Sequence, residues 1–223
     1  MGKRGPKPRS VISTRWSPQL AYAIGLLASD GCMSYPSNLV DLTSRDVEQL
    51  ENYKKCLGIS VMIGTKPGGN AYKGKKYSRV QFKNVMFYNF LTSVGLTPRK
   101  SKTIGALKIP TELFWDFLRG SFDGDGTSYS YWDKRWKSSF MFYTEFISAS
   151  KVHIDWIREE IYNRIGVKGH ITGGVKSSVY QLKFAKNDSL KVLNKMYHSP
   201  DVICLSRKRL KIEKILSIVG ESL

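Results

Sequence analysis

Two apolar stretches of the chain have the spacing of buried helices, and each ends in an aspartate followed by a glycine. The first, residues 20–34, reads LAYAIGLLASDGCMS, and the second, residues 117–128, reads FLRGSFDGDGTS. Helix start signals precede both stretches, with Ser17 before the first and Thr111 before the second. A carboxylate at a helix C-terminus is disfavoured by about 0.3–1 kcal/mol. Both helix ends therefore need a compensating interaction.

The other hydrophobic patterns also occur twice, in the same order. Segments 42–59 and 147–167 each resemble a strand end, a serine and an amphipathic helix closed by a glycine. Segments 77–84 and 179–187 alternate apolar and polar residues, as strands do, and each runs into a further helix. The pattern predicts an α+β fold of two pseudo-symmetric αββαββα halves. The predicted parts are a basic N-terminal arm at 1–14, a first half at 15–104, a linker at 105–110 and a second half at 111–223.

The two helix ends also allow simpler interpretations. Asp-Gly pairs are common in turns, and the letters DGDGT resemble the start of an EF-hand calcium loop. The EF-hand is excluded, because Ser128 stands where that loop needs its turning glycine and Lys134 where it needs a bidentate glutamate. A plain turn remains open on the motif alone.

The chain is strongly basic, which narrows the choice of partner. Its 223 residues include 36 Lys and Arg against 18 Asp and Glu, a net charge of +18. Such an excess in a folded protein predicts a polyanionic partner, most commonly nucleic acid. The sequence has no apolar run of membrane-spanning length and no signal peptide, so we expect no membrane partner.

Cysteine and histidine usage gives no metal or disulfide framework. The three cysteines are far apart and odd in number, so we expect an intracellular protein with neither a disulfide set nor a zinc site. The three histidines, His153, His170 and His198, also lack metal-ligand spacing. We expect all three at the surface or facing nucleic acid.

The sequences of the two helix ends align with each other without a gap. The shared letters are Gly25 with Gly120, Asp30 with Asp125, and Gly31 with Gly126. Two such motifs, about 95 residues apart and each followed by matching strand and helix blocks, resemble the LAGLIDADG homing endonucleases of the single-chain, two-motif kind. The resemblance covers residues 16–218. It implies that the motif helices pack side by side on a pseudo-two-fold axis, and that the two halves form a β-sheet saddle over DNA.

The resemblance further implies a metal site at the floor of this saddle. Asp30 and Asp125, with Gly31 and Gly126 beside them, would hold Mg²⁺, or another divalent cation such as Mn²⁺, or Ca²⁺ in a complex that does not cleave. The first motif departs from the family at Ala28, where the second motif has Asp123. We interpret Asp123 as a helix-end or network residue rather than an essential ligand.

The same resemblance assigns a catalytic lysine to each half. Lys100 and Lys208 stand at matching positions of the segments TPRKSKTI (97–104) and LSRKRLKI (205–212). Each half would cut one strand of duplex DNA, and one chain would act as a monomer. The alternative for both lysines is an ordinary phosphate clamp or an exposed side chain.

Polar residues on the predicted strands and on the longer second hairpin are the candidates for DNA contact. The candidates of the first half are Arg45, Arg79, Gln81 and Lys83. The candidates of the second half are Lys134, Arg135, Lys137, Lys176, Gln181 and Lys183. Any of them could instead be a solvent-facing residue. Because the two halves differ at these positions, we expect a long and asymmetric target.

Two other functions fit the same predicted fold. One is an intron maturase that binds RNA, and the other is a catalytically inactive, sequence-specific DNA-binding protein. Retention of both motif aspartates and both lysines argues against the inactive protein, because a binder needs no clustered carboxylates facing phosphate.

Overall fold

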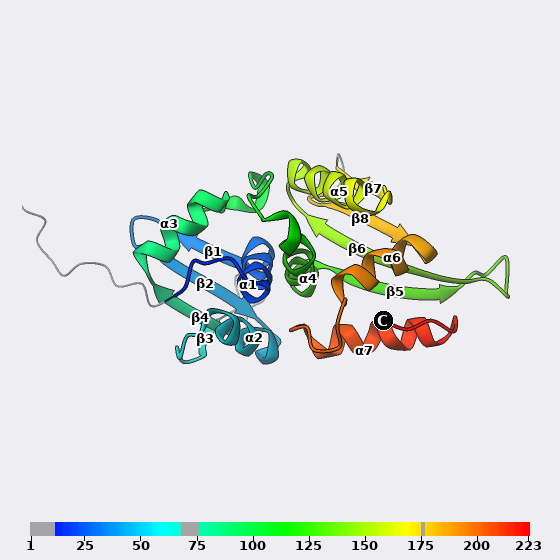
Figure 1. Cartoon of the computed structure of the whole chain (residues 1–223), viewed down its shortest axis with the longest axis horizontal. Helices are drawn as coiled ribbons and strands as arrows, with labels where there is room; N and C mark the ends of the chain where they lie inside the picture. The colour runs from blue at the N-terminus through cyan, green and yellow to red at the C-terminus, as the bar shows by residue number, and fades with distance from the viewer. Residues whose placement is uncertain (1–11, 68–75, 175–176) are drawn as a thin grey trace, which may run out of the picture.

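The computed structural model describes residues 12–67, 76–174 and 177–223, which form two similar halves side by side (Figure 1). Residues 1–11 of the predicted arm and the candidate Lys176 lie outside these ranges. Within them the chain contains seven α-helices and two four-stranded antiparallel sheets, which confirms the predicted α+β class. None of these helices combines the length and apolar character needed to cross a bilayer.

The two halves repeat one order of elements. The first half contains α1 (Pro18–Ser29), β1 (Gly31–Ser34), β2 (Leu39–Ser44), α2 (Val47–Leu57), β3 (Gly64–Pro67), β4 (Lys76–Lys83), α3 (Val85–Val94) and the 3₁₀ turn η2 (Lys100–Lys102). The second half contains the 3₁₀ turn η3 (Thr111–Leu113), α4 (Phe114–Asp125), β5 (Thr127–Trp132), β6 (Phe140–Ser148), α5 (Lys151–Ile165), β7 (His170–Gly173), β8 (Tyr180–Ala185), α6 (Lys186–Met196) and α7 (Ser206–Ser217). The order of elements contains the predicted αββαββα repeat in both halves, and α7 follows it in the second. The strand orders also match, β1-β2-β4-β3 and β5-β6-β8-β7.

Local sequence signals define the ends of several helices. Ser17 caps α1, because its Oγ accepts a 3.1 Å hydrogen bond from the backbone N–H of Leu20. Gly58 and Gly166 end α2 and α5 with left-handed φ values of 63° and 69°, which glycine adopts without steric cost. These positions agree with the amphipathic segments predicted from the sequence.

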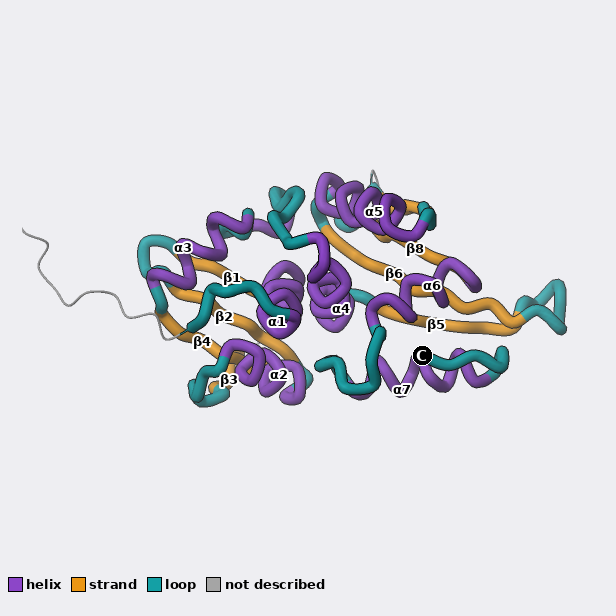
Figure 2. The backbone as a smooth tube through the Cα atoms, viewed as in Figure 1, coloured by secondary structure: helices purple, strands orange, loops and turns teal. Residues whose placement is uncertain are grey.

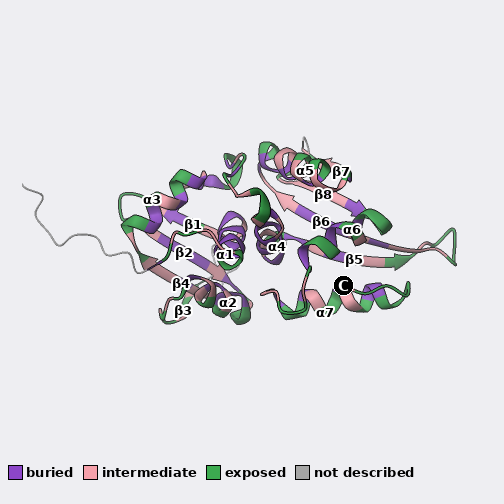
Figure 3. Cartoon of the chain, viewed as in Figure 1, coloured by how far each residue is buried: buried purple, intermediate pink, exposed green. Residues whose placement is uncertain are grey.

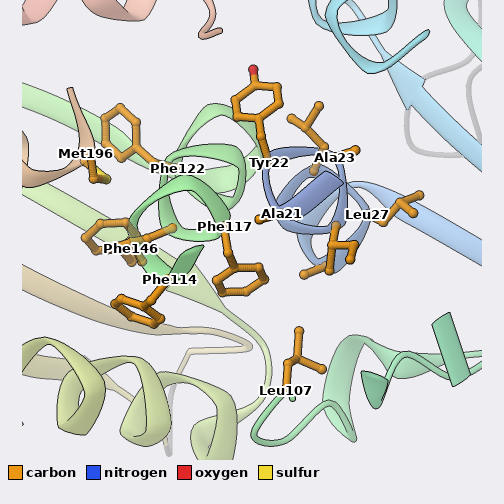
Figure 4. Close-up of a cluster of buried hydrophobic side chains, with 14 of the residues drawn as sticks. Ala21, Tyr22, Ala23, Leu27, Leu107, Phe114, Phe117, Phe122, Phe146 and Met196 are labelled. Carbon is orange, nitrogen blue, oxygen red and sulfur yellow. The ribbon is translucent and has the colours of Figure 1, made fainter. Parts of the chain in front are cut away.

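The centre of the molecule is the contact between α1 and α4, which lie side by side between the two sheets (Figure 2). A Cβ atom on Gly25 would lie 2.1 Å from the carbonyl oxygen of Phe117, and one on Gly120 would lie 2.1 Å from that of Tyr22. Only glycine fits at either position. Around this crossing, apolar side chains of both helices form a continuous core that joins the halves (Figure 4).

Each sheet turns one face toward this core. In β2 the buried Val40 and Leu42 point to the helices, while Leu39, Asp41 and Thr43 alternate onto the opposite face. We call that opposite face the open face of each sheet. Figure 3 shows that burial concentrates on the two central helices and the middle of the sheets, whereas the hairpin between β5 and β6 is exposed.

Strand register relates the positions of the two sheets. Asp41 pairs with Gln81 in the first sheet, and Glu145 pairs with Lys183 in the second. Each acidic residue also pairs with the second residue after a motif aspartate, Asp41 with Cys32 and Glu145 with Thr127. Arg79 and Gln81 of the first sheet therefore correspond to Gln181 and Lys183 of the second.

The two lysine segments have different local structures, although their sequences match. Lys100 lies in the short turn η2, whereas Lys208 lies in the twelve-residue helix α7. The first half cannot continue as a helix, because the chain must leave after Ile104 to reach α4. Residues of α7 such as Ile212 and Leu216 instead bury an apolar face in the core.

Each lysine segment is held against the other half of the molecule. Ser150 Oγ, at the start of α5, donates a 2.5 Å hydrogen bond to the carbonyl oxygen of Ile104. On the opposite side, Arg207 binds both carboxylate oxygens of Asp46 at 2.9 and 2.6 Å, just before α2. The structure thus links the lysine segment of one half to the first outer helix of the other.

Candidate metal and nucleic-acid site

The C-terminal ends of α1 and α4 meet, and each carries one of the predicted metal-binding aspartates. Asp30 caps α1, and Asp125 is the last residue of α4. The backbones are in close contact beside them, since a Cβ atom on Gly124 would lie 1.9 Å from Ser29 Oγ and 3.2 Å from Asp30 Oδ2. The structure therefore brings the two helix-end carboxylates together at one site.

The surroundings of both carboxyl groups disfavour their charge. Burial is the main cause that raises the pKa of Asp30 to about 6, and the negative charge of Asp125 adds to it. Gln49 opposes this shift, because its Nε2 donates a 2.9 Å hydrogen bond to Asp30 Oδ2. Desolvation also raises the pKa of Asp125, although this residue is the more exposed of the two. A cation bound by both groups would relieve this penalty.

A buried ammonium group lies beside each aspartate, at matching positions. Lys100 Nζ donates a 2.7 Å hydrogen bond to the carbonyl oxygen of Gly31, and Lys208 Nζ donates one of 2.7 Å to that of Gly126. The two lysines are 5% and 8% exposed, so neither is a free surface side chain. The C-terminal end of a helix carries partial negative charge, and the aspartate adds a full one. The positive charge of each lysine offsets both.

Lys208 is held more tightly than Lys100. Its ammonium group also donates to the carbonyl oxygens of Phe122 at 2.6 Å and Gly124 at 3.1 Å, so all three N–H groups have acceptors near the end of α4. Burial lowers the pKa of Lys208 to about 8, with Arg207 contributing, while nearby aspartates oppose the shift. Burial lowers the pKa of Lys100 as well.

Gln49 is a site residue that the sequence pattern did not single out. It stands three residues after Asp46, the residue that precedes α2, and it is 2% exposed. Ser44 Oγ donates a 2.8 Å hydrogen bond to Gln49 Oε1, which orients the amide so that its nitrogen faces Asp30. The internal repeat was the available signal for Gln49. His153 occupies the matching position of the second half, three residues after Ser150 at the start of α5.

We expected His153 at the surface from the sequence, and this prediction is wrong. This residue is 3% exposed, and its Nδ1 forms a 2.7 Å hydrogen bond with the carbonyl oxygen of Gly105. The side chain is buried because the start of α5 faces the central helices, where the ring contacts those of Phe117 and Trp156. His170 and His198 are exposed, as expected.

Asp123 has a network role. It is 1% exposed, and its Oδ2 accepts hydrogen bonds from Tyr22 Oη at 2.8 Å and from the backbone N–H of Leu205 at 2.7 Å. These bonds connect α1 and α4 to the residue that precedes α7, and so hold the segment that carries Lys208. Ala28 occupies the matching position of α1 and has no side-chain acceptor. The hydrogen bonds of Asp123 therefore have no counterpart at the end of α1.

The oxygen donors at this site suit a hard divalent cation. The carboxylates of Asp30 and Asp125 are ligands of the kind that Mg²⁺ prefers. The carbonyl oxygens of Gly31 and Gly126 already accept an ammonium hydrogen bond, and a carbonyl oxygen has two lone pairs in all. Among the residues with described positions, no three His, Cys, Asp or Glu side chains form a metal-binding group. A cation here would therefore take its other ligands from water and phosphate.

The DNA-contact candidates of the first half gather on the open face of the first sheet. Arg79, Gln81 and Lys83 alternate along β4 and therefore share that face. Arg45 follows β2, and its guanidinium donates a 3.0 Å hydrogen bond to Tyr77 Oη. The structure thus brings these four candidates onto one surface.

The second half presents a different set of candidates. Gln181 and Lys183 lie on the open face of the second sheet, and Lys183 Nζ is 3.9 Å from the buried Glu145. Three further candidates lie exposed in the loop between β5 and β6: Lys134, Arg135 and Lys137. The basic loop therefore extends beyond the sheet rather than lying on its open face.

No protein-family model and no curated protein sequence matches the chain. Several solved structures are similar in fold. The homing endonuclease I-LtrWI, bound to target DNA, has a TM-score of 0.58 at 12% identity, covering 91% of this chain and 90% of its own. I-DmoI in complex with DNA and Mn has a TM-score of 0.52 at 15% identity, with coverage of 82% and 97%.

The full-length DUF199/WhiA protein from Thermatoga maritima is also similar, with a TM-score of 0.56 at 13% identity. That match covers 95% of this chain but 64% of the WhiA chain, so WhiA is considerably longer. The resemblance predicted from the paired motifs is confirmed for the fold: the chain has the LAGLIDADG fold that these homing endonucleases share with WhiA.

Proposed function

We propose that this protein is a site-specific endonuclease that hydrolyses both strands of duplex DNA at a long, asymmetric target, with Mg²⁺ as its expected cofactor. The observation that carries the proposal is the meeting of Asp30 and Asp125 at the ends of α1 and α4, each beside a buried lysine. A protein that only binds DNA gains nothing from two carboxylates that repel each other and the phosphates. The same two groups are suited to share a divalent cation.

Duplex DNA is the partner that charge and fold support best. The net charge of +18 favours a polyanion, and the similar structures include I-LtrWI bound to target DNA and I-DmoI in complex with DNA and Mn. Strand β1 starts one residue after Asp30 and β5 two residues after Asp125, so a duplex along the open faces would bring its phosphates near both carboxylates. Because one chain supplies both halves, we expect one monomer per duplex.

The aspartates and the glycine carbonyls would share the binding of the cation. Asp30 and Asp125 contribute carboxylate oxygens, and Gly31 and Gly126 contribute the lone pairs that the lysines leave free. Such an ion, when bound, lowers the pKa of a coordinated water and neutralises charge on the phosphate. Asp30 is oriented for this role by its hydrogen bond from Gln49.

The two lysines would act on the phosphate rather than on the ion. Each ammonium group is fixed by a carbonyl next to a motif aspartate, so it can stabilise negative charge that develops at the scissile phosphate without reorganising. Lys208, with three acceptors, is the more rigid of the two.

Cleavage of a duplex selected by binding from a randomised library tests the proposal. We expect Mg²⁺ to produce double-strand breaks, and EDTA to stop cleavage while binding persists. Asp30→Asn and Asp125→Asn should each abolish double-strand cleavage and retain affinity for the duplex. The matched control is Asp155→Asn, a partly exposed residue of α5 that pairs with Lys151, and it should cleave like the wild type. Full cleavage by either motif variant contradicts the proposal.

A sequence-specific DNA-binding protein without nuclease activity is the second candidate. The observation that favours it is the hydrogen bonding of Lys100 and Lys208 to the glycine carbonyls, which places two positive charges where a cation would bind. Such a protein would select a duplex from the library and leave it intact with Mg²⁺ or Mn²⁺. The cleavage assay therefore separates the two functions directly.

A further inference from the structure

The open faces of the two sheets differ in chemistry. The first sheet presents the charged and hydrogen-bonding side chains of Arg79, Gln81 and Lys83. The second sheet also presents Gln181 and Lys183 on β8, but its strands β5 and β6 present three tyrosines, Tyr129, Tyr131 and Tyr143. We call these three residues the tyrosine row. The halves therefore offer unlike surfaces to whatever lies along them.

Strand alternation places the tyrosine row on the open face. Its neighbours in sequence, Ser128 and Thr144, are buried on the core side, where their hydroxyl oxygens lie 3.4 Å apart. Tyr129 and Tyr143 pair directly across the two strands, with alternate residues facing opposite sides. The rings thus stand away from the core.

The rings of the tyrosine row form one continuous surface. The ring centroids of Tyr129 and Tyr143 are 5.1 Å apart at an interplanar angle of 17°, and those of Tyr131 and Tyr143 are 6.1 Å apart at 16°. The hydroxyl oxygens of Tyr131 and Tyr143 lie 3.4 Å apart and can satisfy each other. Tyr131 is 47% exposed. The row therefore offers aromatic carbon and ordered hydroxyl groups rather than free charge.

The surroundings of the tyrosine row favour a nucleic-acid duplex over a protein partner. Met141 and Ile147 extend its apolar surface along β6, while the acidic Glu145 between them is only 4% exposed. Exposed cations follow the row at the hairpin loop, with Lys134 and Arg135 among them. An apolar strip bounded by positive charge complements a groove bounded by phosphates.

The tyrosine row also lies at a defined distance from the candidate site. Tyr129 and Tyr131 follow Asp125 by four and six residues on an extended strand, which corresponds to about 13 and 20 Å at about 3.3 Å per residue. Duplex DNA rises about 3.4 Å per base pair. The row would thus face base pairs roughly four to six steps from the helix ends.

We propose that the second half recognises its side of the DNA target by apolar contact between the tyrosine row and thymine methyl groups in the major groove. The first half would recognise its side mainly by hydrogen bonds from Arg79, Gln81 and Lys83. Among the four bases, only thymine presents a methyl group in that groove. The inference rests on the proposed binding of duplex DNA, but it needs no cleavage.

Replacement of single thymines by deoxyuracil tests this inference, because it deletes one methyl group and keeps base pairing. The probe is the duplex selected from the randomised library, and the readout is its affinity for the full-length protein. We expect weaker binding of up to about fourfold for each fully buried methyl. The sensitive thymines should lie on one side of the target centre, within the segment that faces the tyrosine row.

Protein variants then connect the sensitive methyl groups to the row. Tyr129→Ser and Tyr143→Ser should remove the sensitivity to deoxyuracil, whereas Tyr129→Phe and Tyr143→Phe should keep it, because the ring is retained. Tyr162→Ser, at an exposed position of α5, is the matched control and should behave like the wild type.

Each of the following outcomes would overturn the inference. Methyl sensitivity spread over both sides of the target, or sensitivity that persists in the serine variants, shows that the row does not read thymine. Loss of affinity in the phenylalanine variants assigns recognition to the hydroxyl groups instead. Failure to select any duplex, or tighter binding to a structured RNA, overturns the proposed function itself and this inference with it.

Discussion

Gly25 and Gly120 occupy equivalent positions in the contact between α1 and α4. A Cβ atom on either glycine would lie 2.1 Å from a carbonyl oxygen three residues before the other, that of Phe117 or Tyr22. The backbones of the two helices therefore touch at two symmetric points. This contact sets how closely the helix ends, and with them Asp30 and Asp125, approach each other.

We expect Gly25→Ala and Gly120→Ala to destabilise the protein strongly. Backbone atoms cannot yield as side chains do, so the added methyl group must separate the helices, at a cost of about 3 kcal/mol or more. The control is Gly64→Ala, where the nearest atom to the new Cβ is 4.0 Å away and the backbone φ is not left-handed. Chemical denaturation measures all three variants, and equal stability of the three would refute a close helix contact.

The two site lysines should differ in their effect on stability. Lys208→Met removes hydrogen bonds to three carbonyl groups, whereas Lys100→Met removes one. Since an unsatisfied buried acceptor costs about 1–3 kcal/mol, we expect the Lys208 variant to lose more free energy of unfolding. Lys211→Met, at an exposed position of α7, is the control.

In the cleavage assay we expect each lysine variant to slow hydrolysis by more than about tenfold, or 1.4 kcal/mol in the barrier, with affinity nearly unchanged. Single-turnover rates and binding isotherms on the same duplex separate the two effects. A variant with weakened binding and normal turnover of bound DNA would identify its lysine as a phosphate clamp.

The burial of His153 predicts a pH dependence of folding. Burial is the main cause that lowers its pKa to about 4, against about 6.5 for an exposed histidine. The unfolded chain therefore binds the proton first as pH falls, so the contribution of His153 is fully present above pH 6.5 and is lost between about pH 6.5 and 4. Its size is on the order of 3 kcal/mol.

Denaturation of His153→Gln across this range measures that contribution. Glutamine is the residue at the matching position of the first half, so we expect the variant to fold and to show a flatter pH profile than the wild type. His170→Gln, at an exposed position of β7, should leave the profile unchanged. An unchanged slope in the His153 variant would assign the acid sensitivity to other groups.

The basic surface predicts binding that depends steeply on salt. If the lysines and arginines of both halves neutralise phosphates, the logarithm of affinity should fall with the logarithm of salt concentration by about 0.9 per phosphate contacted. We also expect one protein per duplex in sedimentation of the complex, because α1 and α4 already supply the contact that a dimer would need. A two-to-one complex would instead indicate a dimeric binder.

The repeat in the sequence predicted the architecture of two matching halves. The meeting of Asp30 with Asp125 was predicted by the family resemblance that the paired motifs carry. The same resemblance, applied to the matching segments of the repeat, assigned the lysine positions. Sequence matching could not foresee that Lys100 lies in a turn and Lys208 in a long helix, because the path of the chain after Ile104 decides it.

The residues that support the site were harder to predict. Gln49 and His153 are fixed by the orientation of α2 and α5 on their sheets, and that orientation depends on strand register. A histidine without metal-ligand spacing resembles a surface residue in sequence, so the burial of His153 left no local signal. The tyrosine row escaped notice for the same reason, because Tyr143 joins Tyr129 and Tyr131 only through the pairing of β5 with β6.

The ties between the start of α2 and the chain around α7 bear on how the protein is synthesised. Asp46 and Arg207 are 161 residues apart, and Asn52 and the carbonyl of Cys204 that it binds are 152 residues apart. Contacts between residues so distant in sequence form late in folding. When only the first half has been synthesised, the apolar surface of α1 that packs against α4 is exposed. Such exposed apolar surface favours aggregation. We therefore expect nascent chains truncated before Cys204 to remain sensitive to protease, because the ties to the segment around α7 form only once that segment has emerged.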